Sequence, residues 1–598
     1  MKMPRLIEDY ALIGDLHTAA LVSRSGSIEW LCVPRFDSDG VFASLLGDER
    51  NGCWTLRPAH DVLRTERRYR NNTLVLETTL HCREGSVRVI DFMPRRRENG
   101  AMVVRIVEGI GGSCEMETSL VARFAFGSLP PWTRPHGDCI TLVIGPDGLA
   151  LRASVPLEAR RPDVSARFRL TEGKRETFVL EWFPSHEEPP PARDAVRLLH
   201  ETEERWRSWA ADCSCTGWLR DDVLSSIIVL KALTYEPTGG CVAAPTTSLP
   251  EDFGGSLNWD YRYAWIRDSA FTIEALIVAG LHEEARAWRD WLLRVLGGKP
   301  ERLQIMYSVG GDRRLAEYEA DWLRGFEASR PVRIGNAAYT QFQLGIYGQL
   351  MHAMYITHRD GGIELDAEAW TMLVKLIDHV CEVWQQPDSG IWEYREPAVP
   401  YTVSRAMAWA AVDRAIRFIE REGFDGPLER WRATRDAIHT EVCTNGFHRG
   451  RNAFVQSYGS EMLDASVLLI PIMEFLPADD ERVRSTLAAL ERELIVDGLI
   501  MRDSRFVERD ALGNRRPKEG AFLACNLWLV QNYVLAGRLD DARDLLARVR
   551  DLSNDLGLFS EEYDVRTKRM AGNFPQTFSH ATFVNAAIQL LTAEAASV

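Results

Sequence analysis

The 598-residue sequence predicts a multi-domain β + α protein in which an antiparallel β-sandwich precedes a domain of paired helices. Three observations predict this division. Residues 1 to about 210 carry short apolar runs separated by turn residues, apolar residues recur at helical spacing from about residue 217, and a proline-rich break, PSHEEPPPARDA (184–195), lies between the two regions. We therefore expect a sandwich domain over 1–195, a linker helix over 196–216 and a helical domain over 217–598.

The first region consists of segments that have the pattern of β-hairpins. Residues 18–34 hold two apolar runs around a Ser-Gly turn, and residues 74–94 alternate in polarity on both sides of Glu84-Gly85. Three further segments repeat this pattern: 102–124, 139–154 and 166–183. Successive hairpins separated by Gly, Asp and Pro predict a large antiparallel sandwich.

The second region predicts about twelve helices. The clearest segments are 222–235, 269–280, 284–298, 338–358, 368–386, 404–422, 427–445, 483–495, 524–538, 539–553 and 575–595. Periodicity alone fits either a closed double ring of six helical hairpins or an open α-solenoid. The long connecting loops, which carry Trp, Glu, Arg and Asp, favour the closed ring.

Composition excludes several classes of function. The formal charge, 71 minus 86 or −15, disfavours binding to nucleic acid and to anionic membranes. No apolar run has the length of a membrane span, and the opening MKMPRLIEDYALIGD lacks the apolar core of a signal peptide. The eleven cysteines are scattered without a CxxC pair, so we expect free thiols in a reducing cytoplasm, with no metal site and no cofactor. The sequence leaves a homo-oligomer open.

The loop 256–271, SLNWDYRYAWIRDSAF, concentrates polar and aromatic residues directly before a helix. Arg267 and Asp268 offer a forked donor beside an acceptor, a combination that can bracket the vicinal hydroxyls of a sugar. A buried aromatic cluster with Arg-Asp pairs explains the same residues, and Asp268 could instead cap the following helix.

Three other loops contain candidate carboxylates. SGIWEYRE (389–396) holds Glu393 directly after Trp392, and RRPKEGAF (515–522) holds Glu519. GLFSEEYD (557–564) holds the adjacent Glu561 and Glu562, which must point in different directions. If one of them faces a pocket, we expect the other to face water or a basic neighbour.

Two carboxylates from separate loops are the groups that glycoside hydrolysis needs. One carboxyl protonates the glycosidic oxygen. If the two carboxyls are ~6.5–9.5 Å apart, the other activates a water molecule and the configuration is inverted; if they are about 5 Å apart, it attacks the sugar directly and the configuration is retained. Trp392 beside Glu393 favours desolvation of this carboxyl and a raised pKa, as a proton donor requires. Glu396 and Glu562 are the fallback candidates.

Four motifs together resemble the signatures of glycoside hydrolase family 15: NWDYRYAWIRD, GIWEYRE, SEEYD and PVRIGNAAYTQFQL (331–344). Residues 7–38 resemble the N-terminal domain of the trehalase-like branch of this family. The resemblance covers nearly the whole chain. It implies a super-β-sandwich before an (α/α)6 barrel, and hydrolysis of α-glucosides with inversion.

The resemblance also implies roles for individual residues. Glu393 matches the general acid, Glu561 the general base, and Tyr261 a tyrosine that holds the base and its water. The remaining matches are to residues on the substrate side. Trp265, Arg267 and Asp268 match residues that bind the nonreducing glucose, Trp392 matches the tryptophan before the acid and is also expected to contact substrate, and Arg516 and Glu519 match a substrate-side loop.

Two segments depart from the family pattern. PYTVSR (400–405) stands where the family has a segment close to His-Phe-Thr-x-Ser-Lys, and Gly345 and Gln349 replace two family carboxylates. If Gly345 and Gln349 line the pocket near the leaving-group sugar, the substrate differs from the commonest one.

The sequence therefore predicts an inverting, exo-acting α-glucosidase whose partner is a small neutral sugar, with trehalose favoured. Maltose, isomaltose, kojibiose and short glucans stay open as substrates. The retained Glu393 and Glu561 disfavour a non-catalytic sugar-binding protein, and the SEEYD motif, which supplies a base for water, disfavours a phosphorylase.

Overall fold

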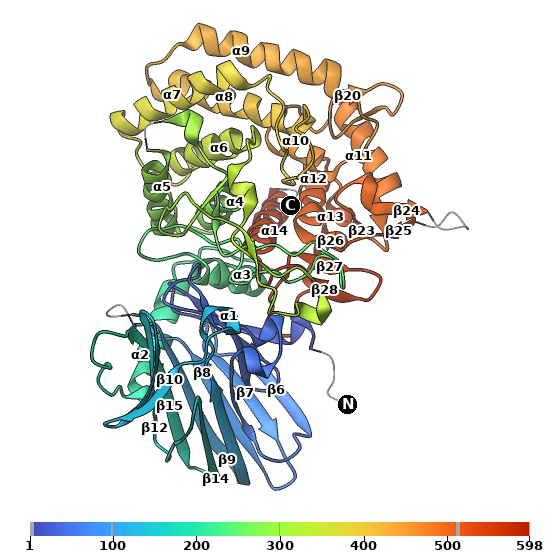
Figure 1. Cartoon of the computed structure of the whole chain (residues 1–598). Coiled ribbons are helices and arrows are strands. Elements are labelled where there is room, and N and C mark those ends of the chain that lie inside the picture. The colour runs from blue at the N-terminus through green and yellow to red at the C-terminus, as the bar shows by residue number, and fades with distance from the viewer. Residues whose placement is uncertain (1–4, 97–99, 298, 510–514, 597–598) are drawn as a thin grey trace.

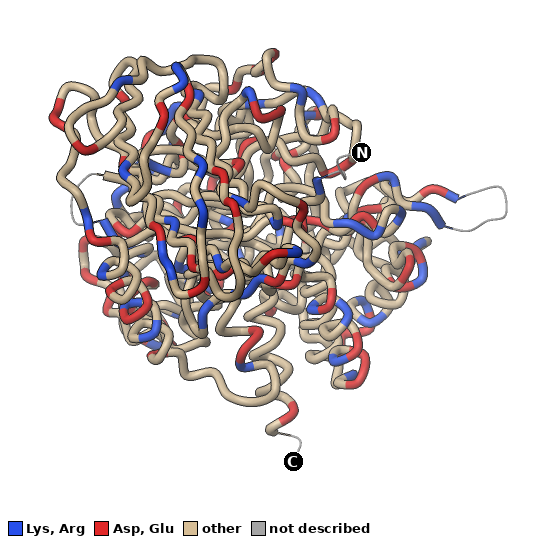
Figure 2. Tube along the Cα trace, turned by 90° about the horizontal axis from the view of Figure 1, so that it is seen from below, with Lys and Arg blue, Asp and Glu red and all other residues tan. Residues whose placement is uncertain are grey.

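The protein consists of a β-sandwich below and a helical domain above in the view of Figure 1. The structure, a computed structural model, describes residues 5–96, 100–297, 299–509 and 515–596. Seen from below, acidic and basic residues are mixed along the chain (Figure 2). Within the described ranges, no helix is long and apolar enough to cross a membrane.

The N-terminal domain contains two antiparallel sheets that share one strand, β9 (Met102–Val121). The first half of β9 pairs with β8 and β15, and its second half pairs with β5 and β14. The other strands are β1 (Tyr10–Gly14), β2 (Ala19–Ser23), β3 (Ser27–Cys32), β4 (Gly40–Phe42), β5 (Cys53–Pro58), β6 (Arg64–Tyr69), β7 (Leu76–His81), β8 (Gly85–Phe92), β10 (Trp132–His136), β11 (Cys139–Ile144), β12 (Asp147–Ala153), β13 (Glu158–Arg160), β14 (Asp163–Thr171) and β15 (Arg175–Pro184).

Two of the expected hairpins are different in the structure. Residues 102–121 form one continuous strand, because the glycines at 109, 111 and 112 allow the chain to bend between sheets without reversing. At Gly109 a Cβ atom would lie 2.2 Å from the Thr171 carbonyl oxygen, so only glycine fits at this bend. β14 and β15 do not pair with each other, since each pairs with a different half of β9. The hairpins expected within 18–34, 74–94 and 139–154 are confirmed.

Helix α2 (Ala195–Ala210) follows the proline-rich segment. Asp194 caps it, because its carboxylate accepts hydrogen bonds from the N–H groups of Val196 and Arg197. Leu198 and Leu199 pack on the sandwich, whereas the indole N–H of Trp209 donates to Glu284 of the helical domain at 2.6 Å. This helix therefore contacts both parts of the chain.

The helical domain is a closed double ring. The inner helices contact one another in the order α4, α6, α8, α10, α12, α14, and α14 contacts α4. They are α4 (Ile266–Val278), α6 (Gly345–Arg359), α8 (Thr402–Glu422), α10 (Leu469–Ile472), α12 (Leu523–Leu535) and α14 (Thr577–Ala596). The outer helices are α3 (Arg220–Ala232), α5 (His282–Leu296), α7 (Ala367–Val383), α9 (Leu428–Glu441), α11 (Glu481–Leu494) and α13 (Leu539–Arg550). The closed ring confirms the predicted barrel and excludes the open solenoid.

The two domains share an apolar core. Leu224, Ile228 and Val229 of α3 belong to the same cluster of buried side chains as the inner faces of the sandwich.

Two predicted helices have different bounds in the structure. The helix predicted over 338–358 begins only at Gly345, since residues 338–344 form a turn and an extended segment instead. The predicted helix 284–298 ends at Leu296, and residue 298 lies outside the described ranges.

Candidate active site

One cavity of about 550 Å³ lies at the N-terminal ends of the inner helices. Each residue of its lining comes from a connection that leads from an outer helix into the next inner helix, or from the first turn of that inner helix. Its aromatic members are Trp259, Tyr261, Trp392, Tyr394, Phe506, Phe522 and Phe578. Its charged members are Glu251, Arg267, Glu393, Arg395, Glu396, Arg502, Arg505, Lys518 and Glu561. This mixture of rings and charged groups has the size and chemistry of a small-sugar site.

Glu561 lies at the cavity directly before β27 (Glu562–Asp564), and its side chain is 2% exposed. The Tyr261 hydroxyl donates to its Oε1 at 2.7 Å, and the Asn573 backbone N–H approaches its Oε2 at 3.4 Å. Burial raises the pKa of Glu561 to about 7, although the hydrogen bond from Tyr261 opposes this change. Gly572 has φ +74°, and a Cβ there would lie 2.5 Å from Glu561 Oε2, so this close approach requires glycine.

Glu393 lies in the loop between α7 and α8 with a left-handed backbone, φ +60°. The indole N–H of Trp265 donates to its Oε1 at 2.7 Å, and Arg267 donates to the same oxygen at 3.1 Å. Oε2 is therefore the oxygen left for a ligand. Burial raises the pKa of Glu393, and the charge of Arg267 opposes this shift. A non-glycine residue with positive φ at a site of this kind marks a position that the surrounding structure holds in place.

Trp392 forms an apolar wall beside Glu393. Its ring packs against Phe522 and Trp528, with centroid distances of 5.5 and 6.0 Å. Its indole N–H donates to the carboxylate of Asp464 at 3.0 Å, so the N–H of Trp392 is not available to a ligand.

The expected glucose-binding set is only partly at the cavity. Arg267 lines it, whereas Trp265 and Asp268 do not. Asp268 is fully buried, its Oδ1 accepts a hydrogen bond from Arg267 at 2.7 Å, and its Oδ2 has no hydrogen-bond partner among the described residues. It does not cap α4, because the N-cap residue is Trp265 and no side chain caps the helix. Trp265 and Asp268 thus contact the residues of the site rather than line its cavity.

The expected substrate-side residues Arg516 and Glu519 lie outside the cavity lining. Arg516 is exposed on β25 (Arg515–Pro517), and Lys518, two residues later, lines the cavity in its place. Glu519 is buried, and Arg502 donates to both of its oxygens at 2.9 and 2.5 Å.

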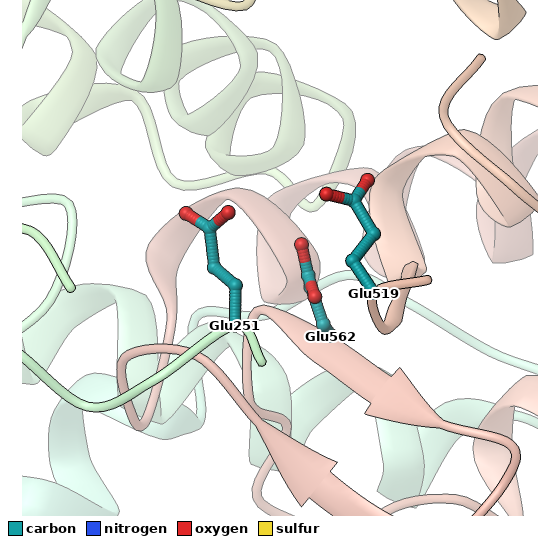
Figure 3. Close-up of side chains that lie close together, drawn as sticks. All are labelled: Glu251, Glu519 and Glu562. Carbon is teal, nitrogen blue, oxygen red and sulfur yellow. The ribbon is translucent and has the colours of Figure 1, made fainter. Parts of the chain in front are cut away.

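Glu519 belongs to a buried cluster of three carboxyls with Glu251 and Glu562 (Figure 3). One oxygen from each residue lies within 4.8 Å of the others. Glu562 points away from Glu561, because successive residues of an extended chain point to opposite sides. It is fully buried, so it does not face water, and it lies among the other carboxyls with the charge of Arg502 nearby. Both of its oxygens lack a hydrogen-bond partner among the described residues.

Burial raises the pKa of Glu251 and of Glu519 to about 8, and it raises the pKa of Glu562 well above the ordinary value. Three carboxyls at this spacing are of a kind that could hold a divalent cation. Arg502, however, already occupies both oxygens of Glu519 and lies 3.9 Å from Glu251 Oε2. The arrangement therefore favours an ionised Glu519 paired with Arg502 beside two carboxyls, Glu251 and Glu562, that hold protons at neutral pH.

The residues that depart from the family pattern lie outside the cavity lining. Gly345 and Gln349 belong to α6 and do not line the cavity, so the condition under which they would indicate a different substrate is not met. In the PYTVSR segment, Ser404 donates to Asp388 at 2.7 Å and Arg405 donates to the Gln385 carbonyl at 3.0 Å.

Sequence reasoning missed Glu251, Arg502 and Lys518, which line the cavity. It also missed Gln341, whose side-chain amide donates to the carbonyl oxygens of Glu393 and Tyr394 and so holds the loop of Glu393. Glu251 follows a proline and Arg502 follows a short strand, and neither lies in a pattern that distinguishes it from an ordinary surface charge.

Two carboxyls, Glu561 buried and Glu393 partly buried, at a sugar-sized cavity in an (α/α)6 barrel define a glycoside hydrolase. A sequence model described as "Glycosyl hydrolases family 15" matches residues 217–588, and one described as "Trehalase-like, N-terminal" matches residues 2–161. The chain belongs to glycosyl hydrolase family 15.

Several relatives are similar over almost the full length. A trehalase of Mycolicibacterium smegmatis is 36% identical, with 98% of this chain and 92% of that protein aligned. A trehalase of Thermoplasma volcanium is 34% identical over 98% of this chain and 93% of that protein. An isomaltose glucohydrolase of Kribbella flavida is 24% identical over 53% of this chain and 75% of that protein. The crystal structure of a bacterial glucoamylase complexed with acarbose has the same fold, with a TM-score of 0.73 and 14% identity over 98% of this chain and 94% of that one.

Proposed function

We propose that this protein hydrolyses trehalose as an inverting, exo-acting α-glucosidase. One observation carries the proposal: Glu393 and Glu561, from loops 168 residues apart, line one cavity, and each is held by its own hydrogen-bond donors. The similarity to trehalases over nearly the whole chain supports trehalose as the substrate.

Glu393 acts as the general acid in this proposal. Its raised pKa favours the protonated form. Its Oε2, which accepts from no donor among the described residues, gives a proton to the glycosidic oxygen as the bond from C1 to that oxygen breaks. The apolar wall of Trp392 keeps water from the carboxyl and so supports the protonated state.

Glu561 acts as the general base. It takes a proton from a water molecule, whose oxygen bonds to C1 from the face opposite the departing sugar. The products are one β-glucose and one glucose released from the leaving side, with inversion at C1. The Tyr261 hydroxyl favours the ionised carboxylate and fixes its orientation through Oε1.

The leaving sugar would bind toward Trp259 and Arg395 in this scheme. The Arg395 guanidinium lies 4.3 Å from the centre of the Trp259 ring and is held by Glu317 at 2.6 Å. Arg333 lies over the same ring at 4.3 Å, and Glu317 accepts from both Nη atoms of Arg395, so the ring edge of Trp259 and the Nε–H of Arg395 are the groups that the described residues leave for a second glucose. Arg267, at the other side, would hold the nonreducing glucose.

The test compares glucose release from trehalose, maltose, isomaltose and kojibiose at equal concentration, with NMR detection of the first anomer formed. We expect preference for trehalose and initial release of β-glucose alongside the glucose of the leaving side. Preference for another linkage would reject trehalose as the substrate and leave the mechanism unchanged. Isomaltose would then be the first alternative substrate, because one relative is an isomaltose glucohydrolase. Retained α-configuration alone would reject inversion, and inactivity on all four would favour a sugar-binding protein.

We also propose the domain division 1–195, 196–216 and 217–598 and a location in a reducing cytoplasm. Free, partly exposed thiols at Cys82, Cys213, Cys381 and Cys443 support the location, because such thiols persist in reducing compartments.

A further inference from the structure

The loop that carries Tyr261 is anchored on both sides of this residue. Tyr261 directs its hydroxyl to Glu561, whereas its neighbours Asp260 and Arg262 are each 1% exposed and pair with each other. Arg262 donates from Nε and Nη2 to the two carboxylate oxygens of Asp260 at 2.9 and 2.7 Å. A bidentate pair of this kind fixes the orientation of both side chains.

The third donor group of Arg262 reaches the sandwich domain. Its Nη1 donates to the Ser38 carbonyl oxygen at 2.6 Å and lies 3.4 Å from that of Phe36. The guanidinium lies 4.9 Å from the centre of the Phe126 ring. Residues 36, 38 and 126 all belong to the N-terminal domain, so the sandwich supplies the remaining contacts of this buried charge.

Asp260 connects the same pair to the cavity. Its Oδ2 accepts a hydrogen bond from the Gly335 N–H at 2.9 Å, and its carbonyl oxygen accepts one from the side chain of Asn336, which lines the cavity. The carbonyl oxygen of Tyr261 itself accepts a hydrogen bond from the Ala244 N–H at 2.9 Å. The backbone on both sides of Tyr261 is therefore fixed.

A buried ion pair often contributes little to stability, because desolvation of the charges offsets their attraction. The pair between Asp260 and Arg262 has a further consequence here, since Tyr261 lies between the two residues. Displacement of either neighbour would rotate the tyrosine away from Glu561.

We propose that the sandwich domain takes part in catalysis through Arg262, a positioning residue that holds Tyr261 against Glu561. The proposal rests on the proposed role of Glu561 as the base. It gives the N-terminal domain a function in the reaction, although none of the residues described in that domain lines the cavity.

The pH dependence of kcat/KM separates positioning from mere stabilisation. The charged and titratable groups that act on Glu561 are Tyr261, Arg267, Arg502, Glu251, Glu393 and Glu562. Loss of the tyrosine hydrogen bond leaves the carboxylate with one donor fewer, so the acid limb of the profile should move to higher pH by about one unit.

The experiment uses the full-length Tyr261→Phe and Arg262→Met variants and the double variant. We expect both single variants to shift the acid limb upward, and the double variant to resemble Tyr261→Phe alone, because both substitutions remove the same hydrogen bond. Additive shifts, or an Arg262→Met variant with the acid limb of the wild type, would overturn the proposal.

Arg105→Met is the matched control. Arg105 is also fully buried and ion-paired, to Asp91 at 2.8 Å, but its hydrogen-bond partners, Asp91, Trp54 and Gly26, all lie within the sandwich. We expect it to lower the unfolding temperature and leave the acid limb unchanged. If Arg105→Met shifted the acid limb as far as Arg262→Met does, any destabilisation of the sandwich domain would be enough to shift it. That result would contradict the proposal.

Two measurements keep the proposal testable in other outcomes. If Arg262→Met does not fold, Phe126→Leu replaces the ring beside the guanidinium from the sandwich side. We then expect a smaller upward shift of the acid limb, and an unshifted acid limb would contradict the proposal. If the wild type hydrolyses none of the four glucosides, the proposed function fails separately. A crystal structure of Arg262→Met, or of Phe126→Leu, then decides the inference: the distance from Tyr261 Oη to Glu561 Oε1 should lengthen beyond hydrogen bonding, and a retained 2.7 Å would refute it.

Discussion

Replacement of Glu561 by glutamine, compared with the same replacement of its neighbour Glu562, tests the site most directly. The two residues are adjacent and both fully buried, yet only Glu561 lines the cavity. In the wild type, the Asn573 N–H lies 3.4 Å from Glu561 Oε2. In Glu561→Gln the amide oxygen can still accept from Tyr261, but the amide nitrogen then faces the Asn573 N–H. Two opposed donors cost about 1–3 kcal/mol of folding free energy. Loss of a general base lowers turnover by about 10²- to 10⁴-fold.

Glu562→Gln should have little effect on turnover. Burial raises the pKa of Glu562 well above its ordinary value, so the carboxyl is already neutral at pH 7 and glutamine is a neutral replacement of the same shape. We expect near-normal kcat and a change in unfolding free energy within about 1 kcal/mol.

The assay is glucose release at pH 7, with thermal unfolding as a check on the fold. The reasoning is refuted if Glu561→Gln keeps more than about a tenth of the wild-type kcat, which is far above the expected loss for a base. It is equally refuted if the two variants lose activity to the same extent, because the structure gives their side chains opposite environments.

Three further predictions follow from the same geometry. Glu393→Gln removes the transferable proton and should lower kcat by about 10²- to 10⁴-fold without loss of the fold; activity and circular dichroism test this, and normal turnover would exclude the acid role. The pKa of Glu251, raised by burial from 4.5 to about 8, gives a stability contribution that is complete below pH 4.5 and is lost as the pH rises through 8. Chemical unfolding between pH 5 and 8 should therefore show falling stability, and a flatter dependence in Glu251→Gln; equal slopes would contradict this. Gly572→Ala puts a Cβ 2.5 Å from Glu561 Oε2 and should lower kcat at least several-fold more than Gly537→Ala, a glycine of similar φ with nothing within 4 Å.

The sequence predicted the architecture because its signals are local. Apolar runs and turn residues mark strands, and helical periodicity over most of residues 217–598 marks the barrel helices except α10, whose four residues are too short to show a period. It could not distinguish a bent strand from a hairpin at 102–124, since that choice depends on partner strands far away in the sequence.

The motif loops likewise contained the residues that meet at the cavity: Tyr261, Arg267, Trp392, Glu393 and Glu561. Their side chains come together because each loop leads from an outer helix into an inner helix at the same end of the ring. Arg516 belongs to such a loop as well but is exposed and lies outside the cavity lining, which no local pattern indicated.

By itself, the sequence determined the two-part fold, the family and the loops that build the site, because periodicity and short motifs are encoded over a few consecutive residues. Only the tertiary structure decided which atoms those loops present to one another. Glu251 and Glu519 belong to one buried cluster with Glu562, and the sandwich contacts the site through Arg262. Burial, pKa and hydrogen-bond partners depend on groups hundreds of residues apart, so they exist only once the chain has folded.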